Sequence, residues 1–315
     1  MTLPPIVLGT MTFGDTVDER VAGEMLDIAF ELGVTAIDTA NGYAGGASES
    51  MLGELLRTRR DQVVLATKAG IPHPDAGDAA PLSKDGVRRC VEASLRRLQT
   101  SYVDLFYLHQ PDRATPMVET VGVVGELLAE GKIAAWGVSN FAAWQIVELR
   151  RLAAEAGVPD PVVAQQLYNL LARRIEEEYV ESALVGGLET VVYNPLGGGL
   201  LTGRHRFEQR PEHGRFGDSR LASMYTDRYW NAELFEAVDE LGKLAESEGL
   251  TLAELSLRWV AQRPGVNTVL IGGSRTEHLR SNIAALRAGA LSPAAIEVCK
   301  AVGVRLRGPM PSYNR

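Results

Sequence analysis

The chain has 315 residues, 45% of them hydrophobic and 23% charged, which is an ordinary globular composition with enough chain to bury a core. Its formal net charge of −8 argues against a broad surface for nucleic acid or for an anionic membrane. The two cysteines and five scattered histidines show no metal-ligand spacing, so we expect no bound metal and a reduced, intracellular protein.

Short β-branched runs alternate with amphipathic helical stretches along nearly the whole chain. The predicted strands are residues 5–9, 34–38, 63–68, 103–109, 133–140, 162–168, 189–196 and 267–273. Their near-continuous apolar character is typical of parallel strands covered on both faces. Apolar residues recur every three or four positions in 17–32 and 87–98, which predicts helices there. The alternation predicts a (β/α)₈ TIM barrel, and an open doubly wound sheet is the alternative.

We interpret residues 1–315 as a single domain with two additions to the barrel. Residues 203–228 are polar and contain glycine, and they predict a long loop over the barrel mouth, followed by an extra helix near 230–248. Residues 305–315 predict a C-terminal tail over the same mouth. Thr115 before Pro116 predicts a helix N-cap. Thr251 with Glu254 predicts a capping box.

Reactive side chains fall at the carboxyl ends of neighbouring strands, where barrel enzymes build their active sites. The second strand ends at Asp38, the third at Lys68 and the fourth at His109, and Tyr43 lies in the short glycine-rich loop after the second. Each residue has an ordinary structural explanation: a helix N-cap, a surface lysine, a core histidine and loop packing, respectively. Because all four converge on one patch, we predict a catalytic site.

This set of side chains supports acid–base chemistry at a carbonyl group. An isolated tyrosine has a pKa of about 10, which makes it a poor acid at neutral pH. The Lys68 ammonium can stabilise the Tyr43 phenolate, and Asp38 can keep Lys68 charged. His109 can hydrogen-bond a substrate oxygen on which negative charge develops. Such a site protonates a carbonyl oxygen while a hydride, for which a nicotinamide is the obvious source, attacks the carbon.

Two segments predict contacts with a dinucleotide. Gly197, Gly198 and Gly199 follow the seventh strand, and glycines let the backbone approach a diphosphate and present N–H groups to it. Ser274 and Glu277 form a capping-box pattern after the eighth strand. A cation at Arg275, near a helix N-terminus, suits the 2′-phosphate of NADP. A plain glycine turn and a solvent-facing arginine are the structural alternatives.

Eight sequence segments together resemble the aldo-keto reductase family over essentially the whole chain. They are LGTMTFG at 8–14, DTANGY at 38–43, TKAG at 67–70, YLHQPD at 107–112, WGVSNF at 136–141, QQLYNLL at 165–171, YNPLGGGLLTG at 193–203 and IGGSRTEHLRSN at 271–282. The chain is most similar to the branches of aflatoxin aldehyde reductases and potassium-channel β subunits. Bacterial sugar- or polyketide-tailoring ketoreductases occur among such relatives.

The resemblance implies an NADPH-dependent reductase with a catalytic tetrad of Asp38, Tyr43, Lys68 and His109. It implies that Ser139, Asn140 and Gln165 hold the nicotinamide carboxamide and that Tyr193 stacks on the ring. The other residues that it places beside NADPH are Gly9, Thr10, Met11, Leu196, Gly198, Leu200, Arg204, Ser274, Arg275, His278, Ser281 and Asn282. Three positions depart from the common pattern: Asn194 replaces serine, His278 replaces glutamine or arginine, and Ser281 replaces glutamate.

We expect the partner to be a small-molecule aldehyde or ketone. The predicted substrate contacts are Phe13, Tyr107, Trp136, Arg228 and Arg315. Two alternatives are a redox-sensing, NADP-binding interaction module like the channel β subunits and a barrel aldolase or isomerase with Lys68 as a Schiff-base lysine. No signal-peptide pattern occurs, and no apolar stretch reaches the roughly 18–20 residues of a membrane helix, so we expect a cytoplasmic protein. The sequence leaves open whether it forms a homo-oligomer.

Overall fold

A computed structural model describes residues 1–309 of the chain. Its contacts divide these residues into two compact units. The first unit comprises Met1–Gln166, Ile175–Tyr193 and Gly265–Arg280. The second comprises Leu167–Arg174, Asn194–Pro264 and residues from 281 onward. Each unit is described by itself below, and a single domain spanning 1–315 stays a prediction.

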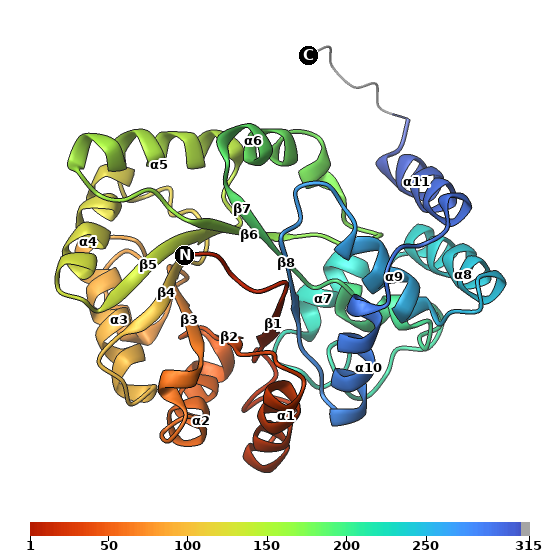
Figure 1. Cartoon of the computed structure of the whole chain (residues 1–315), viewed down its shortest axis with the longest axis horizontal. Helices are drawn as coiled ribbons and strands as arrows, with labels where there is room; N and C mark the ends of the chain where they lie inside the picture. The colour runs from red at the N-terminus through yellow and green to blue at the C-terminus, as the bar shows by residue number, and fades with distance from the viewer. Residues whose placement is uncertain (310–315) are drawn as a thin grey trace. The chain divides into compact units, whose positions relative to one another are not determined.

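Within the described residues, eight strands form a closed barrel in which each strand pairs with its neighbours in sequence and β8 pairs with β1 (Figure 1). The strands are β1 (Ile6–Gly9), β2 (Ala36–Asp38), β3 (Val64–Ala69), β4 (Val103–Leu108), β5 (Ile133–Ser139), β6 (Val163–Leu167), β7 (Glu189–Tyr193) and β8 (Thr268–Ile271). The TIM-barrel prediction is therefore confirmed. Seven of the eight predicted segments contain an observed strand that is one to three residues shorter. β3 has the predicted length but lies one residue later, at Val64–Ala69.

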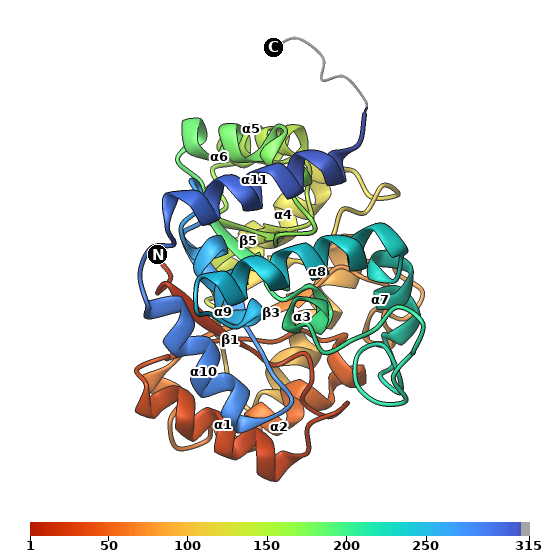
Figure 2. The same cartoon turned by 90° about the vertical axis from the view of Figure 1, so that its right-hand side faces the viewer.

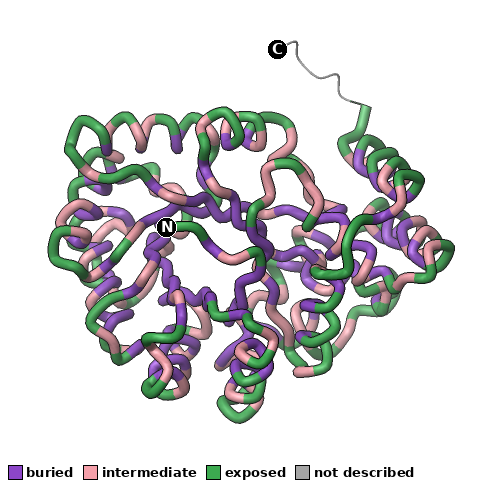
Figure 3. The backbone as a smooth tube through the Cα atoms, in the orientation of Figure 1, coloured by how far each residue is buried: buried purple, intermediate pink, exposed green. Residues whose placement is uncertain are grey.

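Alternate side chains of the strands fill the inside of the barrel. The buried interior cluster contains Leu3, Ala66, Leu105, Tyr107, Val163 and Val191. Tyr107 pairs in register with Gly137, where an added Cβ would lie 2.6 Å from the carbonyl oxygen of Val163 and 3.1 Å from the Tyr107 ring. Glycine at this position therefore makes room for the large phenol. In Figure 3 the strands are almost entirely purple, the colour of buried residues.

Helices of the first unit follow the strands as the apolar spacing predicts. They are α1 (Glu19–Glu31), α2 (Ala47–Leu55), α3 (Lys84–Arg97), α4 (Met117–Ala129), α5 (Ala143–Ala156) and α6 (Tyr179–Gly186), and each packs beside the next. Short 3₁₀ segments are η1 (Tyr43–Gly46), η2 (Arg60–Gln62) and η3 (Pro74–Ala76). The predicted Thr115 N-cap is wrong, because its hydroxyl donates to Asp112 and Pro116 precedes the first helical residue.

The second unit is mostly helical. Its elements are α7 (Ala222–Tyr229), α8 (Ala232–Ser247), α9 (Leu252–Ala261), α11 (Pro293–Arg307) and the 3₁₀ segment η5 (Gly197–Thr202). Figure 2 shows α8 and α11 lying side by side. The capping box of Thr251 and Glu254 is confirmed. η4 (Arg174–Glu176) and α10 (Thr276–Arg287) have residues in both units. No helix within residues 1–309 is long and apolar enough to cross a membrane.

The prediction of a loop throughout 203–228 is wrong from Ala222 onward, where α7 begins. Aromatic side chains explain this difference, because His205, Phe216 and Trp230 pack together with ring centroids 5.2–5.9 Å apart. This small aromatic core stabilises a segment whose polar composition had predicted a loop. The helix predicted near 230–248 is confirmed as α8. The predicted tail also begins later, since α11 continues to Arg307.

Candidate active site

Adjacent strand ends bring Asp38, Lys68 and His109 to one place in the first unit. Asp38 is the last residue of β2, and Lys68 lies one residue before the end of β3. His109 follows β4, and its backbone N–H donates to the carbonyl oxygen of Ala69 over 2.8 Å. The parallel register therefore sets the three side chains next to each other, as the strand order predicts.

The Lys68 side chain is fully buried, and its ammonium group has three acceptors. It donates to the Asp38 carboxylate, to the carbonyl oxygen of Thr39 at 2.9 Å and to the hydroxyl oxygen of Tyr43 at 2.9 Å. Burial alone would lower the pKa of Lys68, but the negative charge of Asp38 and the contact with Tyr43 hold that pKa above its ordinary value. Burial raises the pKa of Asp38, and Lys68 counteracts part of this effect. The structure thus holds a buried ion pair against a phenol.

Tyr43 begins a tight turn between β2 and α2. Ala44, Gly45 and Gly46 all have positive φ angles, of 49°, 64° and 94°. Two of these positions are glycine, which tolerates such angles without a steric penalty. The turn leaves the Tyr43 ring partly exposed, with its centroid 6.0 Å from the His109 ring and nearly perpendicular to it.

A cluster of buried hydroxyl groups, missed by the sequence reasoning, fixes the backbone around Asp38. The Ser48 hydroxyl oxygen lies 2.9 Å from the hydroxyl oxygens of both Thr10 and Thr39. Thr10 also donates to the carbonyl oxygen of Asp38 over 3.0 Å. These contacts fix the position of Thr39, whose carbonyl oxygen accepts a hydrogen bond from Lys68. The only sequence signal was a small hydroxyl residue near the start of α2.

A buried ion network behind β3 was also missed. Glu49 on α2 accepts a hydrogen bond from Thr67, the residue before Lys68, and pairs with Arg97 at 2.8 Å. Arg97 also pairs with Asp75 at 2.6 Å. The network ties α2, α3 and η3 to the strand that carries Lys68. Its members lie far apart in sequence, and no local pattern marks them.

His109 is uncharged at neutral pH. Burial and the Lys68 charge lower the pKa of His109 to about 3. Its Nδ1 atom is buried and has no hydrogen-bond partner among the described residues. An unsatisfied buried acceptor is less costly than an unsatisfied buried N–H, so the ring proton belongs on Nε2.

Asn140 connects three strand ends of the first unit. It has a φ of 63°, a left-handed conformation that asparagine tolerates better than most residues. Its side-chain nitrogen donates to the carbonyl oxygen of His109 and to the Ser139 hydroxyl, both at 3.0 Å. Its side-chain oxygen accepts from the Tyr193 hydroxyl at 2.7 Å. Ser139, Asn140 and Tyr193, predicted as a nicotinamide site, are thus brought together.

Gln165 makes a different contact from the one predicted. Its side-chain nitrogen donates to the second carboxylate oxygen of Asp38 over 2.9 Å. The amide therefore bonds a member of the tetrad, and its expected contact with a carboxamide stays a prediction.

The glycine turn of the second unit does not present its N–H groups as predicted. The amides of Gly197 and Gly199 donate to the carbonyl oxygens of Asn194 and Leu196. The Gly198 amide donates to the side-chain oxygen of Asn194 over 2.6 Å. An added Cβ at Gly198 would lie 2.6 Å from Tyr225, and its φ of 71° also favours glycine. Backbone conformation and packing therefore explain this glycine, and all three amides have acceptors within the protein. The predicted contact of Gly198 with the cofactor stays a prediction.

The remaining predicted cofactor residues differ widely in exposure. Those that are exposed are Arg204, Ser274, Arg275, His278 and Ser281; Met11 and Leu196 are half-buried, and Gly9, Thr10, Leu200 and Asn282 are buried. Helix α10 begins at Thr276, and the carbonyl oxygen of Arg275 accepts from Leu279 at 3.4 Å. Arg275 thus takes the cap position that the capping-box prediction gave to Ser274.

Three predicted substrate contacts have fully buried side chains, and they stay predictions. Trp136 lies three residues before the inward-facing Ser139, so it faces the opposite side of β5, where its indole N–H donates to the carbonyl oxygen of Pro159. Tyr107 lies inside the barrel, one layer below His109, and Phe13 is fully buried. Arg228 is half-buried on α7 and stays a prediction. Arg315 lies outside the described residues.

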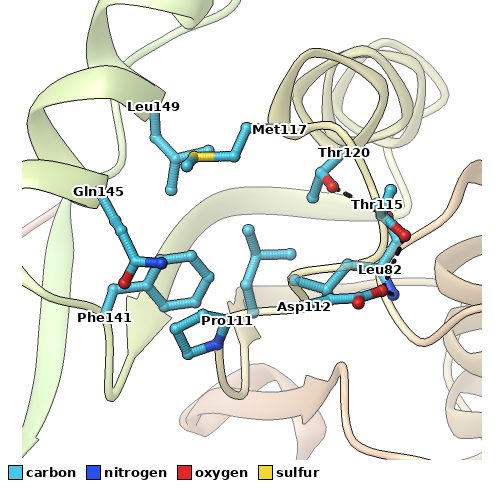
Figure 4. A pocket seen from close by; sticks show the side chains of 10 residues that line it. Leu82, Pro111, Asp112, Thr115, Met117, Thr120, Phe141, Gln145 and Leu149 are labelled. Atoms are coloured by element: carbon cyan, nitrogen blue, oxygen red, sulfur yellow. Dashed lines mark hydrogen bonds between the residues drawn. The ribbon is translucent and has the colours of Figure 1, made fainter.

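A small cavity lies between α4 and α5 (Figure 4). Its volume is about 20 Å³, which suits one water molecule and no substrate. Asp112, its charged lining residue, already accepts from the backbone of Leu82 at 3.1 Å and from the Thr115 hydroxyl at 2.7 Å. We therefore do not assign substrate binding to this cavity.

Comparisons with known proteins identify the family of the chain. The model of the Aldo/keto reductase family matches residues 5–303. Aflatoxin B1 aldehyde reductase member 2 of Rattus norvegicus is 36% identical, over 99% of this chain and 88% of its own length. Aldo-keto reductase YhdN of Bacillus subtilis is 34% identical, over 88% and 83%. A probable voltage-gated potassium channel subunit beta of Arabidopsis thaliana is 31% identical, over 88% and 85%.

Proposed function

This chain belongs to the aldo/keto reductase family, and we propose that it transfers a hydride from NADPH to an aldehyde or ketone, with Tyr43 supplying the proton. The observation that carries the proposal is the position of the Lys68 ammonium, which donates both to the Asp38 carboxylate and to the Tyr43 hydroxyl. A buried cation at hydrogen-bond distance is what a phenol needs to act as an acid near neutral pH.

In the proposed step, Tyr43 gives its proton to the oxygen of the carbonyl group as that oxygen gains negative charge. The phenolate that remains is stabilised by Lys68, and Asp38 keeps Lys68 charged. Lys68 itself is a poor nucleophile, because it is charged and all three of its N–H groups have acceptors. This arrangement argues against the Schiff-base alternative.

His109 would hold the substrate oxygen. Because its pKa is lowered to about 3, the ring is neutral at pH 7 and has a single N–H to donate. With that proton on Nε2, the ring can donate to the carbonyl oxygen beside the Tyr43 hydroxyl. The hydrogen bond strengthens as the oxygen becomes an alkoxide, so it favours the transition state over the ground state.

NADPH, when bound, would supply the hydride that reduces the carbonyl carbon. The linked side chains of Ser139, Asn140 and Tyr193 fit a nicotinamide, because their amide and hydroxyl groups can meet a carboxamide and the phenol ring is partly exposed. Exposed Arg275, at the start of α10, would meet the 2′-phosphate. Arg204, predicted beside the diphosphate, is exposed on the second unit and stays a prediction.

The proposal is tested by following NADPH absorbance while the purified protein is offered a panel of aldehydes and ketones that includes 4-nitrobenzaldehyde. We expect saturable NADPH oxidation that requires the carbonyl compound. Tight NADPH binding without turnover of any member of the panel would favour the redox-sensing interaction module instead.

A further inference from the structure

Gln165 and Asp38 are joined by a buried hydrogen bond across the barrel. The two residues are 127 positions apart in sequence, on β6 and β2, and only 3% of Gln165 and 1% of Asp38 are exposed. A carboxylate can only accept hydrogen bonds, so the amide must present its nitrogen to Asp38. The orientation of the Gln165 side chain is therefore set by the tetrad.

This bond completes the donors around the Asp38 carboxylate. One carboxylate oxygen accepts from Lys68 and the other accepts from Gln165. A carboxylate in a buried site is costly unless its oxygens have donors. Without the amide, the second oxygen would face a cavity of about 10 Å³ whose other lining includes Val7, Ile37 and Val191. The one other titratable side chain in this lining is Tyr107, whose phenol also hydrogen-bonds Gln165 and whose pKa is raised by burial and by the charge of Asp38. That volume is at the lower limit for one water, so solvent is a poor replacement for the amide.

We propose that Gln165 is a positioning residue, which keeps Asp38 ionised and directed at Lys68 and so controls how readily Tyr43 gives up its proton. The inference rests on the proposed function, because it assigns Tyr43 the role of proton donor. It goes beyond that function by giving Gln165 a role that does not involve the cofactor.

The effect of Gln165 reaches Tyr43 in two steps. Loss of the amide makes the Asp38 carboxylate less stable and weakens its hold on the Lys68 charge. A less firmly charged Lys68 stabilises the Tyr43 phenolate less. Tyr43 should then ionise at a higher pH, which the protein can show without NADPH or substrate.

The experiment is a spectroscopic titration of the cofactor-free protein. The near-ultraviolet phenolate absorbance is recorded against pH for each variant and for the same variant carrying Tyr43→Phe, and the difference reports Tyr43 alone. Gln165→Leu removes the donor at similar volume. Gln165→Asn keeps an amide but shortens the side chain. This variant is titrated as well, and it tests the proposal if Gln165→Leu does not fold.

Gln166 provides a matched control. It is the next residue on β6, it is buried, and its side-chain nitrogen donates to the carbonyl oxygen of Phe141 over 2.8 Å. Gln166→Leu therefore removes a comparable buried amide bond on the opposite face of the same strand. Any general effect of losing such a bond should appear in both leucine variants.

We expect the Tyr43 midpoint to rise by about one pH unit, as loss of a hydrogen bond to a charged group implies, in both Gln165 variants and to stay in place in Gln166→Leu. An unchanged midpoint in a folded Gln165 variant would overturn the proposal, as would an equal shift in Gln166→Leu. Failure of the proposed function is distinguishable, because it would leave the wild-type protein inactive on carbonyl compounds without altering this titration.

Discussion

The Nζ atom of Lys68 lies 2.9 Å from the hydroxyl oxygen of Tyr43, and the two residues are 25 positions apart in the chain. The same ammonium is bonded to Asp38, and no part of the Lys68 side chain is exposed. Charge, phenol and carboxylate are thus coupled, and the ion pair is buried while the phenol is partly exposed. Changes to each member should have separate and measurable effects.

Tyr43→Phe should lower kcat for carbonyl reduction by roughly 10²–10⁴-fold, because the phenol supplies the proton while the ring still fills its place. NADPH binding should be nearly unchanged. Stopped assays with 4-nitrobenzaldehyde and a fluorescence titration with NADPH measure the two quantities. Tyr179→Phe, which removes a buried phenol bonded to Thr190 at 2.8 Å, is the control. A Tyr43→Phe protein that works at the wild-type rate would rule out the assigned role.

Asp38→Asn should destabilise the protein by about 3–5 kcal/mol, because it leaves the buried Lys68 charge without a counter-charge. The double variant Asp38→Asn with Lys68→Met removes both charges and should recover part of that loss. Urea unfolding of the wild type, both single variants and the double variant gives the coupling energy. Strictly additive losses would show that the two charges do not stabilise each other.

Acid should weaken the fold through the half-buried His109 and the buried His205. Burial and nearby cations lower the pKa from the ordinary 6.5 to about 3 for His109 and to about 4 for His205. The unfolded chain therefore binds more protons than the folded chain below pH 6.5. The stability that the neutral histidines contribute is complete above that pH and declines as pH falls toward each lowered pKa, by about 1.4 kcal/mol per pH unit for each histidine.

Variants of these histidines test that dependence. His109→Gln and His205→Gln should each flatten the decline in unfolding free energy between pH 6.5 and pH 4, measured by urea unfolding at several pH values. The exposed His213, which pairs with Asp218, has a raised pKa. His213→Gln should therefore not flatten the decline in unfolding free energy between pH 6.5 and pH 4. Equal slopes in the wild type and in His109→Gln would contradict the assignment of a buried neutral ring.

Arg275→Ala should weaken NADPH binding about 10–100-fold and leave NADH binding nearly unchanged, because the guanidinium would meet only the 2′-phosphate. Dissociation constants for both cofactors, measured by fluorescence, give the comparison. Arg280→Ala on the same helix is the control, since Arg280 pairs with Glu31 at 2.6 Å. Equal losses for NADPH and NADH would remove the 2′-phosphate assignment.

Asn194→Ala should lower the unfolding free energy by about 1–3 kcal/mol. Asn194 has a φ of 59°, bonds the Gly198 amide and donates to the Tyr229 hydroxyl at 2.9 Å. Asn194→Gly keeps the backbone angle but loses the bonds, so its stability should lie between those of the wild type and Asn194→Ala. Thermal unfolding of the three proteins measures the order of their stabilities. If Asn194→Ala is as stable as Asn194→Gly, the backbone angle at this position carries no strain.

The barrel and the positions of Asp38, Lys68 and His109 were open to prediction because they depend on local pattern. Apolar runs of strand length alternating with helical spacing require a layered α/β architecture, and parallel strands place their carboxyl ends together. Three reactive side chains at the ends of consecutive strands must then become neighbours. Only the alternation and the strand order are needed for this conclusion.

Other contacts depended on which surfaces meet after folding. Gln165 reaches Asp38, Ser48 reaches Thr39, and Glu49 reaches Arg97 only because the closed barrel and its helices bring distant segments within hydrogen-bond distance. The same holds for Asn194, whose side-chain oxygen accepts a hydrogen bond from the Gly198 amide. The glycine pattern had predicted that this amide would donate to a phosphate. Composition tells which groups can donate or accept, but a hydrogen bond requires a distance and a direction, and only the packed chain supplies both.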